Sequence, residues 1–167
     1  TGVFNQNSST VDFNGATTQS SSIVNFYNLI FSGSGSKSSG SGSLLVENNL
    51  IVKGNATFNT TTNVEILGDL IAEETGTINI GVTNLTVWNN LTIANGSAAT
   101  LIISNAAGGK TVNGDFTVNS NAVYNNTGNE ILSIGGNVTL NGTLTFGTAP
   151  LTLTGISKSI NSNSSIA

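Results

Sequence analysis

The chain has 167 residues, about the length of one domain, and its net charge of −4 comes from only 4 basic and 8 acidic side chains. All four cations are lysines, so the basic surface that nucleic acids and anionic membranes require is missing, and neither a nucleic-acid partner nor membrane insertion is expected. Histidine and cysteine are absent, which removes the commonest general base, thiolate nucleophiles and most ligand sets for zinc, copper or haem, so no cofactor is expected.

Residues 1–43 form the least regular part of the chain. We assign the apolar residues Phe4, Val11 and Phe13 to one repeat unit and Phe26, Leu29 and Phe31 to the next, because Phe26 lies 20 residues before Val46. The stretch from Ser32 to Ser43 (SGSGSKSSGSGS) has the composition of a flexible linker. Because it lies inside a possible repeat unit, we favour the alternative that it is a polar turn bulging from the body.

From residue 44 to residue 150 a seven-residue pattern recurs. The pattern is apolar, any, Gly or Asn, Asn or Asp, apolar, any, apolar, and its copies begin 20, 21, 25 and 22 residues apart, a mean of 22. The copies are VENNLIV (Val46 to Val52), ILGDLIA (Ile66 to Ala72), VWNNLTI (Val87 to Ile93), VNGDFTV (Val112 to Val118) and IGGNVTL (Ile134 to Leu140).

The residues around each copy alternate with a period of two, which places one face of the chain inward and the other outward. Successive copies cannot close hairpins with one another, because each turn recurs at the same place and the chain must return to the same edge. These constraints predict an all-β parallel β-helix, or solenoid, with coils of about 22 residues stacked about 4.8 Å apart. We expect residues 1–167 to form a single solenoid body, with 44–150 as its regular coils. Two inward lanes are predicted, one of Val46, Ile66, Val87, Val112 and Ile134, the other of Leu50, Leu70, Leu91, Phe116 and Val138.

The two turn positions at the middle of each copy have distinct residue preferences. The first position is always Asn or Gly, which tolerate a positive φ at least cost, so a left-handed kink is predicted there at Asn48, Gly68, Asn89, Gly114 and Gly136. The second position is always Asn or Asp. Stacking of the coils would set these side chains above one another in a hydrogen-bonded column, the turn ladder, which consists of Asn49, Asp69, Asn90, Asp115 and Asn137.

Residues 151–167 continue the alternating pattern, and no helix or atypical polar repeat that would cap the last coil is recognisable there. An uncapped coil leaves backbone N–H and C=O groups unpaired, and such an edge templates further strands. We therefore expect both ends of the solenoid to join more protein, either as neighbouring coils of the same polypeptide or as identical subunits docked end to end.

Two groups of residues are candidates for chemistry or binding. Asp69 and Asp115 would lie two coils apart, about 9.6 Å, a separation used by inverting glycosidases. We favour a structural role in the turn ladder, because no arginine or histidine is present to bind a uronate or tune a proton. Leu67 and Trp88 follow the first apolar residue of their copies and therefore point outward on adjacent coils. One interpretation is that they form a contact patch for a neighbour or a sugar. The interpretation that we favour is that a loop buries them.

Four segments resemble a known type of repeat: NFYNLIFSG (Asn25 to Gly33), NVEILGDL (Asn63 to Leu70), NLTVWNNLTI (Asn84 to Ile93) and GGNVTLNGTLTF (Gly135 to Phe146). They resemble the repetitive β-helix regions of large secreted surface proteins of Bacteroidota, including gliding-type and other giant adhesins, and more loosely filamentous-haemagglutinin-like passengers. No C-terminal sorting domain and no haemagglutinin-type secretion motif accompany them.

The resemblance implies a right-handed β-helix, export to the cell surface, and a non-enzymatic structural or adhesive role in an extracellular fibre. Surface glycans would be a possible class of ligand. Two alternatives stay open. In the first, the chain is a self-assembling filament subunit that polymerises through its solenoid ends or donated strands. In the second, which is less favoured, it is a carbohydrate-active β-helix enzyme.

Overall fold

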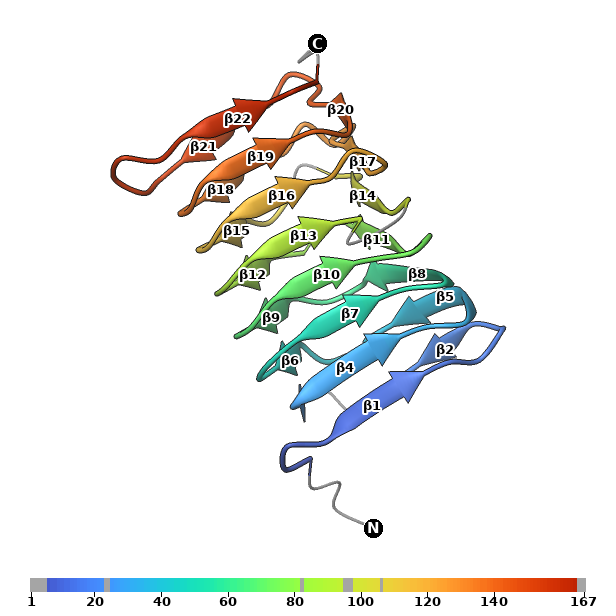
Figure 1. The fold of residues 1–167 in the computed structure, drawn as a ribbon. Helices are drawn as coiled ribbons and strands as arrows, with labels where there is room; N and C mark the ends of the chain where they lie inside the picture. Colours follow the sequence, from blue (N-terminus) through green and yellow to red (C-terminus); the bar gives the residue numbers. More distant parts are fainter. Residues whose placement is uncertain (1–5, 23–24, 82, 95–97, 106, 165–167) are drawn as a thin grey trace.

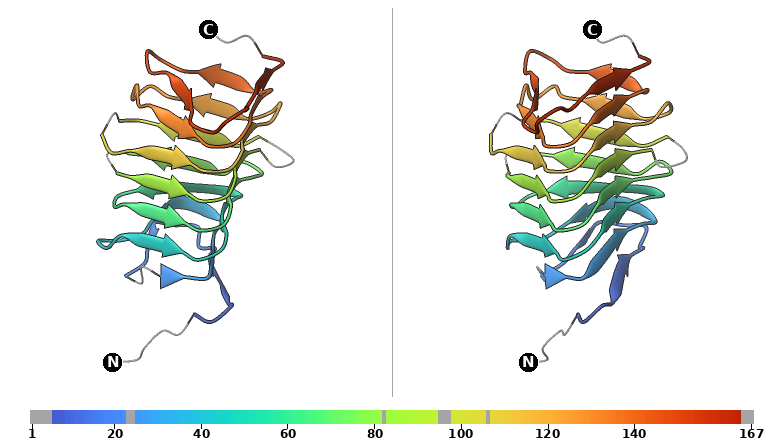
Figure 2. Two further views of the ribbon diagram at one scale, coloured as in Figure 1. Left: turned by 90° about the vertical axis from the view of Figure 1, so that its left-hand side faces the viewer. Right: turned by 60° about the vertical axis from the view of Figure 1, so that its left-hand side comes forward.

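A computed structural model of the protein describes residues 6–22, 25–81, 83–94, 98–105 and 107–164. Within these ranges the chain forms 22 strands and no helix, and hence no helix long and apolar enough to cross a membrane. The strands belong to three parallel sheets, which the chain visits in the same order in every coil (Figure 1). Three-strand coils stack along one axis, with the first and the last coil at opposite ends (Figure 2). The predicted all-β parallel solenoid is confirmed.

The first sheet, sheet A, receives the strand that follows the turn ladder in each coil. The smallest step between register partners is 18 residues, from Val11 to Leu29, and the largest is 25, from Leu91 to Phe116, on either side of the predicted 22. Its strands are β1 (Thr10–Phe13), β4 (Asn28–Phe31), β7 (Leu50–Val52), β10 (Leu70–Ala72), β13 (Leu91–Ile93), β16 (Phe116–Val118), β19 (Val138–Leu140) and β22 (Ile160–Ser162).

Sheets B and C complete each coil. Sheet B consists of β2 (Gln19–Ser20), β5 (Ser34–Ser38), β8 (Asn55–Thr60), β11 (Thr77–Ile80), β14 (Thr100–Ile103), β17 (Val123–Asn125) and β20 (Thr143–Thr145). Sheet C consists of β3 (Asn25–Phe26), β6 (Leu44–Val46), β9 (Val64–Ile66), β12 (Leu85–Val87), β15 (Lys110–Val112), β18 (Leu132–Ile134) and β21 (Leu151–Leu153).

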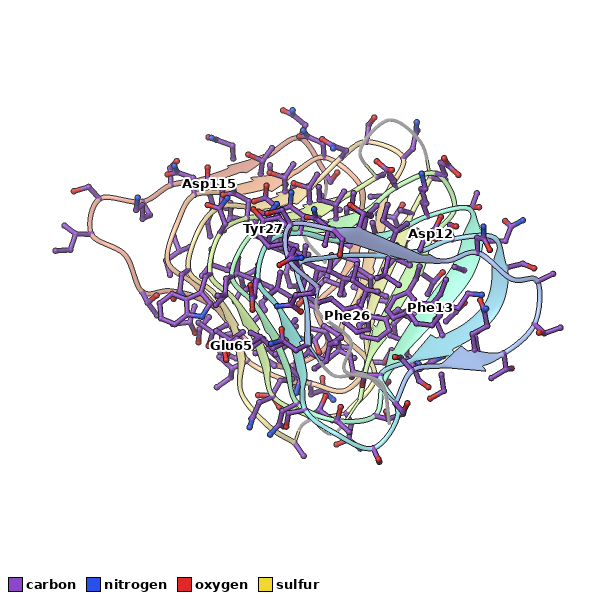
Figure 3. The ribbon with its side chains drawn as sticks, turned by 90° about the horizontal axis from the view of Figure 1, so that it is seen from below. Asp12, Phe13, Phe26, Tyr27, Glu65 and Asp115 are labelled. Atoms are coloured by element: carbon purple, nitrogen blue, oxygen red, sulfur yellow. The ribbon has the colours of Figure 1, made fainter. Side chains whose placement is uncertain are left out.

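The core lies inside the triangle that the three sheets enclose. Seen along the axis, Phe13 and Phe26 lie within the ring of backbone, while Glu65 and Asp115 lie on its outside (Figure 3). Both predicted inward lanes are confirmed, because their members are register partners in adjacent coils and every one is fully buried. A short aromatic stack, with 4.8 Å between the ring centroids of Phe31 and Phe58, fills the core near the N-terminal end.

The left-handed residues occupy different corners from the predicted ones. None of the five residues at the first turn position has a positive φ; instead Gly54, Glu74 and Ala94, at the corner between sheets A and B, have φ values of 62°, 54° and 61°. The prediction of a left-handed kink beside the turn ladder is therefore wrong. Glycine serves a different purpose there, because a Cβ built on Gly68 would lie 2.4 Å from the carbonyl oxygen of Asn48 in the preceding coil.

The Ser/Gly-rich stretch from Ser32 to Ser43 is neither a linker nor a bulge. Its central residues form β5, which pairs in parallel with β2 on one side and β8 on the other. Lys37 enters the core lane beside Phe58 and is fully buried, and its Nζ donates to the carbonyl oxygen of Gly15 (2.6 Å) and to Oε1 of Gln19 (2.7 Å). Composition misled the prediction because a long lysine stem can line a core while its ammonium reaches polar acceptors.

The ends of the solenoid are less well packed than its middle. β21 and β22 pair with β18 and β19, and within the described residues no strand pairs with their outer edges. The hydrophobic residues that pack against the core while staying partly exposed belong to the first coil and to the end nearest residue 164: Val11, Phe13, Phe146, Leu151 and Leu153.

Candidate functional site

The turn ladder stands at the corner between sheets C and A. In each step, a side-chain Oδ1 accepts a hydrogen bond from the backbone N–H of the equivalent residue one coil later. The donor–acceptor distances are 2.9 Å from Asn49 to Asp69, 3.0 Å from Asp69 to Asn90, 2.9 Å from Asn90 to Asp115, and 2.7 Å from Asp115 to Asn137. The same contact continues from Asn28 to Asn49 (3.3 Å) and from Asn137 to Ser159 (3.2 Å).

The turn ladder joins side chain to backbone, whereas the sequence suggested bonds between side chains. Only one bond between its side chains is present among the described residues, from Nδ2 of Asn90 to Oδ1 of Asp69 (3.1 Å). Because the contact uses one acceptor oxygen, asparagine and aspartate serve equally well, which explains why both occur at this position.

The two aspartates are occupied by this arrangement. Oδ1 of Asp69 accepts from the backbone N–H and Nδ2 of Asn90 and from Nδ2 of Asn89 (2.7 Å), and Oδ1 of Asp115 accepts from Asn137. Within the part of the chain that the structure describes, no three acidic side chains gather into a group that could hold a metal ion. The arrangement is suited to holding the corner together.

Leu67 and Trp88 lie one coil apart on the outside of the same corner. Their side chains are 44% and 54% exposed, so the favoured expectation that a loop buries them is wrong. The reason is the shortness of this corner: only three residues separate β12 from β13, which leaves no chain to fold over the indole ring. The two longer connections that follow Trp88 in sequence, residues 94–99 and 104–109, join sheet A to sheet B and sheet B to sheet C, and so belong to the other two corners.

A groove runs across the outer face of sheet C beside Trp88. Its volume is about 400 Å³. Its floor consists of outward residues from three successive strands, Leu45, Glu65 and Thr86, which are register partners. We call this the Trp88 groove; it is lined by Ser43, Leu44, Leu45, Asn63, Val64, Glu65, Asn84, Thr86 and Trp88.

A hydrogen bond fixes the tryptophan against the groove. Nε1 of Trp88 donates to Oε1 of Glu65 at 2.8 Å, and Glu65 belongs to the preceding coil. This contact draws the indole ring towards the sheet C floor and holds it beside the groove. Glu65 is also the only charged residue in the lining of the groove.

The amides on the opposite side of the groove are fixed by the backbone. Oδ1 of Asn63 accepts from the N–H of Asn84 (3.1 Å), and Oδ1 of Asn84 accepts from the N–H of Gly109 (2.7 Å). These bonds repeat the chemistry of the turn ladder at the corner between sheets B and C. Sequence reasoning missed Asn63, Glu65 and Asn84 as groove residues, although the alternation places Glu65 outward one coil before Trp88, which could have identified it.

Lys110 is a second buried cation. It replaces the leucine found at this lane position in the coils on either side, Leu85 and Leu132, and its Nζ donates to the carbonyl oxygens of Ala107 (2.7 Å) and Gly108 (2.8 Å). Burial lowers the pKa of the Lys110 ammonium, while Glu130 acts in the opposite direction. The ammonium ties the long connection to the core.

Comparison with known protein families, with curated proteins and with solved structures gives no match for this chain.

Proposed function

We propose that this chain is a non-enzymatic structural and adhesive element of an extracellular surface fibre. The observation that carries the proposal is the uninterrupted parallel register of all three sheets from the first coil to the last. Each coil is bonded to the next by backbone hydrogen bonds in three sheets and by the turn ladder. A body built in this way is a stiff rod whose length is set by the number of coils.

Two further features support a role without catalysis. In the two aspartates whose spacing suggested a glycosidase, Oδ1 accepts a backbone hydrogen bond of the turn ladder. The chain also has neither histidine nor arginine to assist proton transfer or to bind an anionic transition state. An extracellular location is inferred from the resemblance of the repeats to secreted surface proteins.

The experiment that tests this proposal is immunogold electron microscopy with antibodies raised against residues 1–167. On intact, unpermeabilised cells of the source organism we expect gold particles on surface fibres, lost after brief protease treatment of the cells. Labelling that requires permeabilisation would contradict the proposal.

A second candidate function, a filament subunit, is favoured by the packing at the ends. Core residues that are fully buried in the middle coils have partly exposed counterparts such as Val11 in the first coil and Leu151 near the other end. A second copy stacked end to end would cover them and pair the outer strand edges.

Sedimentation velocity of residues 1–167 over a range of concentrations tests this second function. We expect elongated head-to-tail oligomers, and Leu151→Lys should abolish them. Thr117→Lys, on the outer face of sheet A in a middle coil, is the matched control and should leave them unchanged. A concentration-independent monomer would exclude the subunit function and leave the fibre element standing.

A further inference from the structure

We infer that the Trp88 groove is a binding site for a neutral pyranose glycan. This inference rests on the proposed adhesive function and gives that function a ligand class and a place on the molecule. The groove is the one part of the described surface where a large exposed aromatic ring, fixed amides and a rigid floor come together.

The aromatic ring is the first element of the site. Trp88 is 54% exposed, although burying such a ring would ordinarily be favourable, and no loop or neighbouring coil covers it within the described residues. Its only polar atom is already bonded to Glu65, so the ring needs no further polar partner and offers an apolar face. Apolar faces of this kind stack on the C–H face of a pyranose ring, and because the hydrogen bond holds the ring in place beforehand, binding costs little side-chain entropy.

The amides are the second element. The backbone bonds that hold Oδ1 of Asn63 and of Asn84 fix the orientation of both side chains. Within the described part of the chain, their Nδ2 groups donate to no protein acceptor, so two positioned N–H donors are free for sugar hydroxyl oxygens. Thr86 adds a hydroxyl group on the floor between the amides and the indole.

The floor sets the size and shape of the ligand. Leu45, Glu65 and Thr86 come from three successive coils, so the floor spans about 10 Å along the axis at a strand spacing of about 4.8 Å. The floor belongs to paired strands and is therefore rigid. It is open along the outer face of the sheet, which suits an extended glycan chain.

Charge selects against acidic sugars. The only charged group of the lining is the Glu65 carboxylate, and the protein as a whole carries −4. A uronate or a sialic acid would meet repulsion without any cation in the lining to offset it. The ligand class is therefore a neutral pyranose.

The single tryptophan makes the test specific, because all indole fluorescence of the chain reports on this groove. The wild-type chain is titrated with cellohexaose, chitohexaose and β-1,4-galactohexaose, with hexagalacturonate as the acidic comparison. We expect a saturable change in emission, with a dissociation constant of about 1 mM or tighter for at least one neutral probe. Protection of Trp88 from acrylamide quenching should follow the same curve.

Three variants assign the binding to the groove, with affinities measured by isothermal titration calorimetry. Trp88→Ala should weaken binding by at least about tenfold, which is a rise of one decade in the dissociation constant. Glu65→Gln keeps an acceptor for the indole N–H but removes the one charge of the lining, so it should narrow the difference in affinity between the neutral probes and hexagalacturonate. Thr111→Ala, on the same outer lane one coil beyond the groove, is the matched control and should bind as the wild type does.

Several outcomes would overturn the inference: no response to any neutral probe, hexagalacturonate binding as tightly as these probes, or undiminished binding by Trp88→Ala. Protection of Trp88 from acrylamide that rises with protein concentration in the absence of sugar would show that a second copy covers the ring, and would overturn the inference as well. None of these results bears on the fibre element itself, which immunogold labelling tests separately.

Discussion

At the scale of single residues, the turn ladder depends on one acceptor atom per coil. Oδ1 of Asn90 accepts from the N–H of Asp115, and no other side chain within the described residues reaches that N–H. Asn90→Ala should therefore destabilise the protein by about 0.5 to 1.5 kcal/mol, the usual net contribution of one hydrogen bond, because this contact lies at an exposed corner. Urea denaturation measures the change, and an unaltered midpoint would contradict a structural role of the ladder.

Asn90→Asp is the informative companion variant. It keeps the acceptor but places a third carboxylate between Asp69 and Asp115, at a coil spacing of about 4.8 Å. Repulsion between the carboxylates should then destabilise the protein at low salt. Because salt at about 1 M shortens the Debye length to about 3 Å, most of this loss should disappear there, whereas the loss caused by Asn90→Ala should persist.

Lys110 links stability to pH. The unfolded chain keeps the proton of this lysine up to about pH 10.4, whereas burial makes the folded protein release it at a lower pH. Between the two pKa values the unfolded state binds more protons, so stability rises with pH in this window and falls as the pH drops through the folded-state pKa. Burial lowers the pKa of Lys37 as well, so both lysines contribute to the rise.

Lys110→Leu tests this linkage. Leucine matches Leu85 and Leu132 in the adjacent coils, and replacing a buried charge by a well-packed apolar residue should raise stability at pH 7 by about 1 to 3 kcal/mol. Chemical denaturation at pH 7 and at pH 9.5 should also show a smaller alkaline gain than in the wild type. Lys158→Gln, at an exposed lysine, is the control, and a variant with an unchanged pH slope would refute the assignment.

At the scale of strands and corners, the Ser/Gly-rich stretch provides the sharpest test of the fold. Gly33 has a φ of 71°, and a Cβ there would lie 2.3 Å from the carbonyl oxygen of Asn14. Gly33→Ala should cost about 1 to 3 kcal/mol because the backbone is held in a left-handed conformation against the preceding coil. Gly109→Ala, where the nearest atom to a Cβ is 4.0 Å away and φ is ordinary, should be tolerated. If the Ser/Gly-rich stretch were a flexible linker, Gly33→Ala would be tolerated as well as Gly109→Ala is.

The strands predicted from the sequence are those in which alternation and repeat reinforce each other. An inward lane is predicted at Val46, Ile66 and Val87 because apolar and polar residues alternate around them and their spacing recurs. β5 could not be found in this way, because its serines and glycines carry no apolar signal and its only core side chain is a lysine. Its strand character comes from pairing with β2 and β8, which composition does not encode.

The candidate site shows the same division. The column from Asn49 to Asn137 could be predicted from spacing alone, because stacking follows from the repeat. The choice of backbone N–H as the donor depends on the shape of the corner, and so does the absence of left-handed residues beside it. The exposure of Trp88 depends on which corner holds the extra residues of a long coil, and that choice is set by three-dimensional packing.

At the scale of the whole molecule, stability should depend on position along the axis, because each coil contacts only its neighbours. Leu91 is fully buried between coils on both sides, whereas Leu151 is partly exposed near one end. Leu91→Ala should cost about 2 to 5 kcal/mol through the lost contacts and the cavity, and Leu151→Ala less than half as much. Equal losses in urea denaturation would show that the body does not behave as a linear stack.

The direction of the turn ladder has a consequence for how such a protein changes over generations. In every step of the turn ladder the earlier coil supplies the acceptor oxygen and the later coil the N–H, so each coil offers an N–H on one side and an acceptor oxygen on the other. A whole coil can therefore be duplicated or lost while the hydrogen-bond pattern of the turn ladder is kept. The length of the solenoid is then set by the number of coils that the gene encodes. Recombination between repeated gene segments would change this length in increments of about 4.8 Å.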